Sequence, residues 1–551
     1  MKRIILLTAA VGTLLIGALA FRTDYFEISK NLEIFTDLYK ELNTYYVDDI
    51  DPNDIMQEGI GAMLQSLDPY TNFISEADME DYRFQTTGKY GGIGSLIQKS
   101  GEYVMVSEPY QDNPADEAGL RAGDRIVRID EYDVVGKSTQ DVSKLLKGEP
   151  GTAVEVEVER PTLDGGFETV VVDIVRREVQ IDNVPYHGMV DDHIGYIRLS
   201  NFTQEAGQEV ADALKDLKEE DPDLAGVVLD VRGNPGGLLK EAVNVCNVFI
   251  EKGELIVMTM GKNPEWDREF KTINEPVDTE IAVAVLTSRG SASASEIVSG
   301  AIQDLDRGVV IGQKTFGKGL VQTTRPLAYN SSLKVTTAKY YIPSGRCIQA
   351  IDYAERNEEG AVVKIPDSLK TAFETRNGRT VYDGGGIDPD IPVDMRTLNE
   401  ISISLLRKNL IFDYATQFVL RNETIPPADA FELSDAQYAD FVDWLSDKEY
   451  DYTTDSERTL EELRDEVKEE GRLAAVEADL DELGEEIMHD KERDLQNHRT
   501  EIQRLLEVEI ATRYHYQRGS IEAGFKYDDD LAEALRTLTD SGAYEDILTA
   551  R

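Results

Sequence analysis

The sequence predicts a multidomain α/β protein in which a β-rich domain precedes an α/β core and helical segments lie at both ends. Its 551 residues are too many for one ordinary domain of about 100–200 residues. Hydrophobic residues make up 41% of the chain, which is enough to build several cores. The predicted parts are a signal peptide or membrane anchor at 1–21, an N-terminal helical region at 22–82, the β-rich domain at 83–178, the α/β core at 179–394 and an acidic helical region at 395–551.

Residues 1–21 have the features of a secretory signal peptide. An apolar run from Ile4 to Phe21 follows a basic start, and Ala18-Leu19-Ala20 matches a cleavage site. The run also approaches the length of a membrane-spanning helix, which leaves a retained inner-membrane anchor open. Because basic residues precede the run, we expect the rest of the chain to be exported to the periplasm.

The next two regions differ in their hydrophobic period. Between 22 and 82 apolar residues recur at helical spacing, as in Leu32, Phe35 and Leu38. From 83 to 178 short strands and glycine turns take over, with one helix expected near 138–147. The alternation in 154–158 is typical of a half-buried strand.

From 179 to 394 predicted strands alternate with helices, which is the pattern of an α/β core. Strands are expected at 223–231 and 281–286, and a helix at about 293–305. Beyond 395 the chain is helical and acidic, since residues 401–551 hold 38 acidic and 17 basic side chains. A solvated helical bundle explains this region, while a homodimer arm or a partner-binding surface stays open.

Charge and cysteine content restrict the partners. The formal net charge is −49, which disfavours nucleic acids and anionic membrane surfaces. The acidity fits either simple solubility or adaptation to salt. Two cysteines, Cys246 and Cys347, are too few for a disulfide framework or a cysteine-built metal site, and we expect free thiols. No cofactor or metal is predicted.

The segment 289–296 combines serines with a strand-to-helix turn. A serine there can present its hydroxyl beside the N–H groups of a first helical turn, although ordinary helix capping explains the same residues. None of the five histidines lies in a recognisable triad context, so the candidate base is Lys318, held between Gly317 and Gly319. A lysine accepts a proton only when neutral, whereas its ordinary pKa is about 10.4, so such a base must be desolvated and kept from carboxylates.

Two further segments need interpretation. Residues 312–318 match most of a phosphate-binding loop, but Gly319 replaces the required Ser or Thr and a strand follows, so a nucleotide site is not favoured. Residues 230–237 place paired glycines, Gly236 and Gly237, after a strand. Backbone N–H groups in such a turn suit an oxyanion hole.

Together these segments resemble the C-terminal processing peptidases, the tail-specific serine proteases of the S41 type. The motifs are D-V-R-G-N-P-G-G at 230–237, S-A-S-A-S-E at 291–296 and T-F-G-K-G-L-V-Q at 315–322. The resemblance implies Ser293 as nucleophile, Lys318 as general base and Gln322 as the residue that orients it. It also implies oxyanion donors at Ala294 and at Gly236 or Gly237. Asp304 corresponds to an aspartate that is important in some members, and a structural role suits it equally.

The β-rich domain resembles a PDZ domain. Its carboxylate-binding loop would be formed by Tyr90, Gly91, Gly92, Ile93 and Gly94. A protein or peptide C-terminal tail would then add as a strand beside it. The resemblance implies an exported serine endopeptidase with a Ser–Lys dyad that selects proteins by their C-termini. The alternative is a PDZ scaffold on an inactive protease fold.

Overall fold

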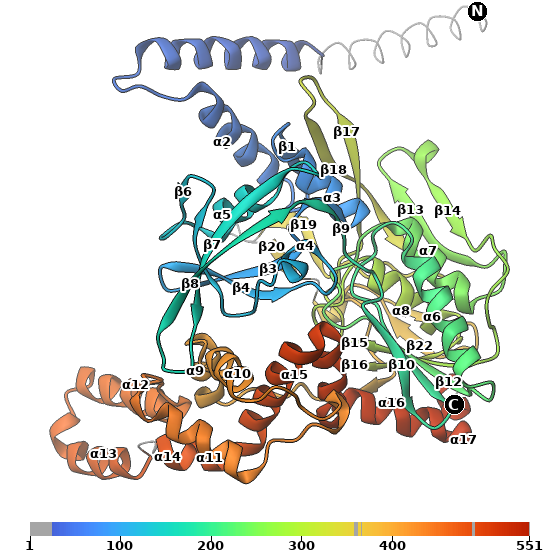
Figure 1. The fold of residues 1–551 in the computed structure, drawn as a ribbon. Coiled ribbons are helices and arrows are strands. Elements are labelled where there is room, and N and C mark those ends of the chain that lie inside the picture. Colours follow the sequence, from blue (N-terminus) through green and yellow to red (C-terminus); the bar gives the residue numbers. More distant parts are fainter. Residues whose placement is uncertain (1–24, 357–361, 365, 488–490, 550–551) are drawn as a thin grey trace, which may run out of the picture. The chain divides into compact units, whose positions relative to one another are not determined.

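A computed structural model describes residues 25–356, 362–364, 366–487 and 491–549 (Figure 1). The predicted signal peptide at 1–21 lies outside these residues. Among the residues described, none of the helices combines the length and apolar character needed to cross a bilayer. The chain divides into two units, which we describe separately: Met1–Ser75 with Thr324–Thr336, and Glu76–Thr323 with Thr337–Arg551.

The first unit contains the predicted N-terminal helices. A helix covers residues 25–45 and is followed by α2 (Pro52–Gln65) and β1 (Asn72–Ile74). Asp51 caps α2 by accepting the N–H of Asn53 at 2.7 Å, and proline occupies the first helical position. β1 pairs antiparallel with the first residues of β18 (Ser332–Tyr341).

The second unit begins with α3 (Met79–Thr87) and the predicted β-rich domain. Its sheet contains β3 (Ser95–Ser100), β4 (Tyr103–Pro109), β5 (Arg125–Ile129), β6 (Tyr132–Asp133), β7 (Ala153–Pro161) and β8 (Phe167–Val175), with helices α4 (Pro114–Glu117) and α5 (Thr139–Leu146). The alternation predicted for 154–158 is confirmed, because Val154, Val156 and Val158 are buried in the domain core.

The α/β core is built on a six-stranded sheet. Its order is β10 (Tyr186–Asp191), β11 (Ile194–Arg198), β12 (Gly226–Asp230), β15 (Ala282–Thr287), β16 (Val309–Gly312) and β23 (Ile391–Pro392). β10 is antiparallel to β11, and the other neighbours are parallel. Every residue of β12 is buried, as expected for a parallel strand covered on both faces.

Helices from distant parts of the chain cover the two faces of this sheet. On one face lie α6 (Ala206–Glu220), α7 (Leu239–Phe249) and α8 (Ala294–Asp304). On the other face lie α16 (Asp529–Thr539) and α17 (Ser541–Leu548), drawn in red in Figure 1. The sheet therefore receives one of its two helical layers from the last residues of the chain.

Shorter strands flank the core. They are β2 (Lys89–Gly92) paired with β9 (Arg177–Gln180), β13 (Leu255–Gly261) paired with β14 (Arg268–Lys271) and with the end of β18, β17 (Leu320–Pro326), β19 (Ile351–Arg356) with β20 (Val362–Lys364), and β21 (Ala372–Glu374) with β22 (Thr380–Tyr382). Both cysteines are free thiols, as expected, and Cys246 is buried in α7.

The acidic region beyond 395 is helical, as predicted. Its helices are α9 (Glu400–Arg407), α10 (Leu410–Arg421), α11 (Asp435–Trp444), α12 (Asp455–Glu469), α13 (Leu473–Ile487), α14 (Lys491–Asn497) and α15 (Arg499–Gly524). Helices α9, α10, α11, α14 and α15 enclose a separate apolar core that includes Phe418, Phe441 and Leu506. α15 is kinked, because His515 and Tyr516 leave the helical backbone conformation.

Candidate active site

Three loops meet at one edge of the parallel sheet. Residues 231–237 follow β12, residues 288–293 follow β15 and residues 313–319 follow β16. These three strands are adjacent and parallel, so their carboxyl ends lie together, which is where open α/β sheets form their sites. The three motifs, more than 80 positions apart from first to last, are thereby brought into one place.

Ser293 occupies the N-cap of α8 with an unusual backbone. Its φ is 54° and its ψ is −110°, a conformation that serine rarely adopts and that costs about 1–3 kcal/mol. Gly236 packs directly against it, since a Cβ at Gly236 would lie 2.8 Å from the Cβ of Ser293 and 2.6 Å from the carbonyl oxygen of Ala292. The glycine turn and the serine are therefore in contact.

Of the two alternative oxyanion donors predicted in the turn, one already has a partner. The N–H of Gly236 donates to Oδ1 of Asn234 at 2.9 Å, so that group is already occupied. Of the two glycines, Gly237 is the one whose N–H the turn can offer. Ala294 is the first residue of α8, and its nitrogen would lie 2.8 Å from a Cβ at Gly236. The glycine turn and the start of α8 thus lie together. Ala294 and Gly237 are the residues left as candidate oxyanion donors.

Glu296 connects the serine to the lysine loop. Its carboxylate oxygen Oε2 accepts the N–H of Ser293 at 2.8 Å and the N–H of Lys318 at 2.9 Å. The other oxygen, Oε1, accepts the N–H of Gly317 at 2.7 Å and the hydroxyl of Thr315 at 2.6 Å. Burial raises the pKa of Glu296 to about 7, although these four hydrogen bonds favour its charged form.

Sequence reasoning did not single out Glu296. Its signal was present, because Ser293-x-x-Glu296 fits the capping-box pattern in which the glutamate bonds to the N-cap N–H. Tyr340 was also missed. Its hydroxyl donates to the carbonyl oxygen of Lys318 at 2.5 Å and to that of Ser293 at 3.1 Å, which gives the two residues a second shared partner.

The remaining predicted residues lie in different places. Gln322 is half-buried on β17. Asp304 ends α8 and is separated from Ser293 by the whole helix, about 16 Å at 1.5 Å per residue. It pairs with Nη2 of Arg346 at 2.8 Å and accepts the N–H of Ser344 at 3.0 Å. Burial raises the pKa of Asp304, against the effect of Arg346. These contacts anchor the far end of α8.

The predicted carboxylate loop is only partly a loop. Tyr90, Gly91 and Gly92 belong to β2 and pair with β9, while Ile93 and Gly94 form the turn into β3. No cluster of three or more His, Cys, Asp or Glu side chains suited to a metal ion occurs in the part of the chain that the structure describes.

Comparisons with known proteins agree with this architecture. Residues 193–355 match Peptidase family S41, residues 105–160 match a PDZ domain, and residues 401–538 match the C-terminal helical domain of probable PDZ-proteases. A carboxy-terminal-processing protease of Bartonella bacilliformis is 38% identical over 324 residues, which cover 58% of this chain and 73% of that protein.

Two solved structures are also similar. The photosystem II D1 C-terminal processing protease is 28% identical, with a TM-score of 0.35, over 65% of this chain and 92% of that one. The PDZ domain of a carboxy-terminal protease from Vibrio cholerae, crystallised with a peptide, is 31% identical, with a TM-score of 0.16, over 17% of this chain and 99% of that one.

The chain is therefore a serine protease that carries a PDZ domain and a C-terminal helical domain. It belongs to peptidase family S41, among the carboxy-terminal-processing proteases.

Proposed function

We propose that the chain is an exported endopeptidase in which Ser293 is the nucleophile and Lys318 the general base, and that its PDZ domain selects proteins by their C-termini. The observation that carries the proposal is the shared oxygen of Glu296, which binds the N–H groups of both Ser293 and Lys318. This carboxylate contacts the backbone of Lys318, so it positions the lysine loop through main-chain bonds.

The reaction begins when neutral Lys318 takes the proton of the Ser293 hydroxyl. The serine oxygen attacks the scissile carbonyl carbon, and the N–H groups of Ala294 and Gly237 stabilise the oxyanion. Collapse breaks the C–N bond, and Lys318 returns the proton to the leaving amine. Lys318 then takes a proton from water, whose oxygen attacks the acyl carbon. Collapse breaks the bond between that carbon and Oγ of Ser293, and Lys318 returns the proton to Oγ. Gln322 would orient the lysine, whereas Asp304 acts only through the anchorage of α8.

Variants of two lysines in one loop test the dyad. Lys318→Arg should be as inactive as Lys318→Ala, because guanidinium does not deprotonate in proteins. Ser293→Ala should fold normally and show no cleavage. Lys314→Ala is the matched control, since Lys314 lies in the same loop but pairs with Asp388 at 2.8 Å. An active Lys318→Arg or Ser293→Ala enzyme would contradict the dyad.

Selection of C-termini and export have their own tests. Two quenched-fluorescence peptides that differ only in a free or amidated C-terminus should be cleaved at different rates, the free acid faster, because a PDZ loop binds a carboxylate. Equal rates would contradict PDZ selection. Cell fractionation should recover the chain outside the cytoplasm, and sequencing of its mature N-terminus separates cleavage after Ala20 from a retained anchor.

A further inference from the structure

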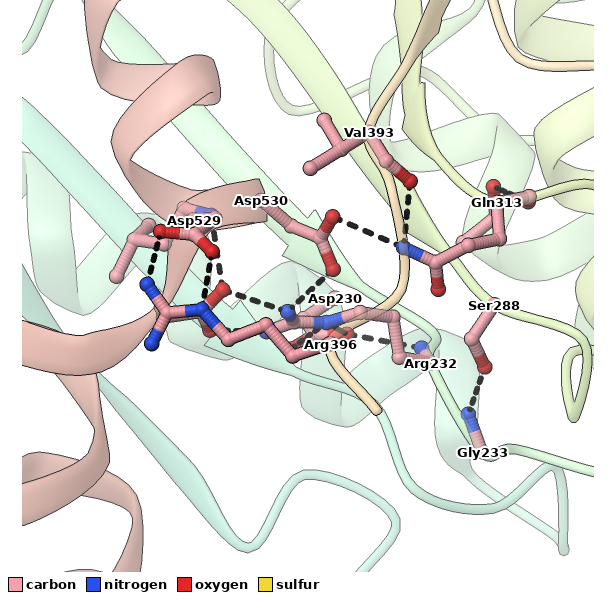
Figure 2. A network of polar contacts seen from close by, with 12 residues as sticks. Asp230, Arg232, Gly233, Ser288, Gln313, Val393, Arg396, Asp529 and Asp530 are labelled. Carbon is pink, nitrogen blue, oxygen red and sulfur yellow. Dashed lines mark hydrogen bonds and ion pairs between the residues drawn. The ribbon is translucent and has the colours of Figure 1, made fainter. Parts of the chain in front are cut away.

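Helix α16 begins at the sheet edge that carries the candidate active site. Asp528 is its N-cap and accepts the N–H of Leu531 at 3.0 Å, and Asp529 and Asp530 follow in the first turn. Figure 2 shows Asp530 directed toward Arg232 and Gln313, and Asp529 directed toward Arg396. Neighbouring carboxylates of one helix thus contact different parts of the chain.

Arg232 lies between two sets of carboxylates. It follows β12, and its side chain binds Asp230, the last residue of that strand. Its Nη1 also donates to Asp528 at 2.8 Å and to Asp530 at 2.9 Å, and its Nη2 donates to Asp528 at 2.6 Å. The arginine side chain is only 18% exposed, so this network is largely withdrawn from water. Arg232 immediately precedes the glycine turn that contacts Ser293.

Asp530 also binds the loop of the candidate base. Its Oδ2 accepts from Arg232, while its Oδ1 accepts the amide of Gln313 at 3.1 Å. Gln313 is the first residue after β16, five positions before Lys318, and its amide also donates to the carbonyl oxygen of Val393 at 3.1 Å. One carboxylate, 11% exposed, therefore bridges the loop with the oxyanion turn and the loop with the lysine.

We propose that Asp530, supported by Asp528, is a positioning residue for peptide cleavage, which fixes the oxyanion turn and the lysine loop relative to each other. The C-terminal helical domain then completes the active site through α16. This inference rests on the proposed function of Ser293 and Lys318. Asp530 touches Arg232 and Gln313, neither of which is assigned a chemical step. Its effect is therefore on geometry, and a misplacement of about 1 Å can cost up to about 100-fold in rate.

The test compares Asp530→Ala with Asp529→Ala in the full-length protein. Asp529 lies in the same helical turn, carries the same charge and pairs on the surface with Arg396 at 2.6 Å. We expect Asp530→Ala to lower kcat by about 10- to 100-fold with an unchanged KM for a short peptide, after correction for the folded fraction. Asp529→Ala should keep both constants. Equal kcat values for the two variants, or a loss explained by unfolding, would overturn the proposal.

Gln313→Ala provides a second test that leaves the Arg232 network intact. It removes the bridge to the lysine loop and the bond to Val393 but keeps the contacts of Asp530 with Arg232, so we expect a smaller fall in kcat. Combined with Asp530→Ala, it should add little, because both changes break the same contact. Multiplicative losses would refute a shared bridge. Asp530→Asn keeps an acceptor and should retain more activity than Asp530→Ala. A failed dyad would instead appear as an active Ser293→Ala enzyme, so the two failures are distinguishable.

Discussion

The C-terminal helical domain makes two contacts within the second unit, and they differ in kind. Against the peptidase sheet, α16 and α17 bury apolar side chains such as Leu531 and Leu538 on β12, β15 and β16. The hydroxyl of Tyr544 exchanges hydrogen bonds with the backbone of Val283, at 3.0 Å from its N–H and 3.2 Å to its carbonyl. This contact is packed like the interior of a domain.

The contact with the PDZ domain is built around a cavity. A cavity of about 340 Å³ lies between α10, α15 and the PDZ domain, and its lining includes Glu108, Asp116, Leu420 and Arg513. Tyr516 reaches across to Asp116 with a hydrogen bond of 2.9 Å. Its backbone has a φ of 53°, which is strained for an aromatic residue and persists only where surrounding packing imposes it.

The difference suggests how the enzyme divides stability and movement. The packing of α16 and α17 on the sheet is a continuous apolar core, and a cavity of about 510 Å³ borders the Arg232 network at its edge. We expect the apolar core to open only with the peptidase itself. The PDZ contact encloses a cavity and is therefore incompletely filled, as in domain interfaces that move. If the PDZ domain selects C-termini as proposed, binding of a tail is expected to change the second contact and leave the first intact.

The largest expected effect comes from a charge placed in each contact. Leu531→Asp buries a carboxylate among apolar side chains of the sheet, at a cost of about 3–5 kcal/mol, and should prevent soluble expression or sharply lower the melting temperature. Leu420 lines the cavity, where water can reach a new carboxylate. Leu420→Asp should therefore cost about 1 kcal/mol of stability or less. Similar losses of melting temperature in the two variants would contradict the difference in packing between the two contacts.

Removing one hydroxyl from each contact should give a moderate difference. Tyr544→Phe leaves backbone groups of Val283 unpaired in a buried setting, which should cost about 1–3 kcal/mol. Tyr516→Phe loses one bond beside a cavity that admits water, and should cost less than about 1 kcal/mol. Chemical denaturation, monitored by hydrogen exchange in β15, measures the change of stability in both variants. A larger loss of stability in Tyr516→Phe than in Tyr544→Phe would show that the PDZ contact is the better packed.

The smallest expected effect is a pH response confined to the PDZ contact. Burial raises the pKa of Glu108, with Arg513 opposing and Glu509 reinforcing the shift, and burial also raises the pKa of Asp413. Both groups bind protons more readily in the folded contact than in the unfolded chain. The contact should therefore gain stability as pH falls through their folded-state pKa values, with the gain complete below the ordinary carboxyl pKa.

The sheet contact should respond less, because two of its carboxylates, Asp230 and Asp530, act in opposite directions. Despite burial, Arg232 and Arg198 hold the pKa of Asp230 well below its usual value, whereas burial raises that of Asp530. Hydrogen exchange at about pH 7.5 and about pH 5.5, corrected for intrinsic rates, should show greater protection at low pH in α10 and α15 than in α16. Glu108→Gln should reduce this difference. Equal changes of protection in α10, α15 and α16 would argue against a pH response confined to the PDZ contact.

Local patterns in the sequence were sufficient for the elements that carry the site. The apolar runs at 223–231 and 281–286 became β12 and β15, and the predicted helix after Ser293 became α8. Each of these depends on neighbouring residues alone, through burial of a strand or a strand-to-helix turn. The occupied N–H of Gly236 could not be predicted, because it depends on where the Asn234 side chain points.

What the sequence by itself determined was the set of chemical groups: a serine on a tight turn, a lysine between glycines and a glycine turn for an oxyanion. Tertiary structure decided which groups share a partner. Glu296 joins Ser293 to Lys318, and Asp530 reaches Arg232 across 298 positions of sequence. Such contacts follow from the order of parallel strands and from the docking of a distant helix. Both are set by burial of whole surfaces, and no local spacing of residues encodes them.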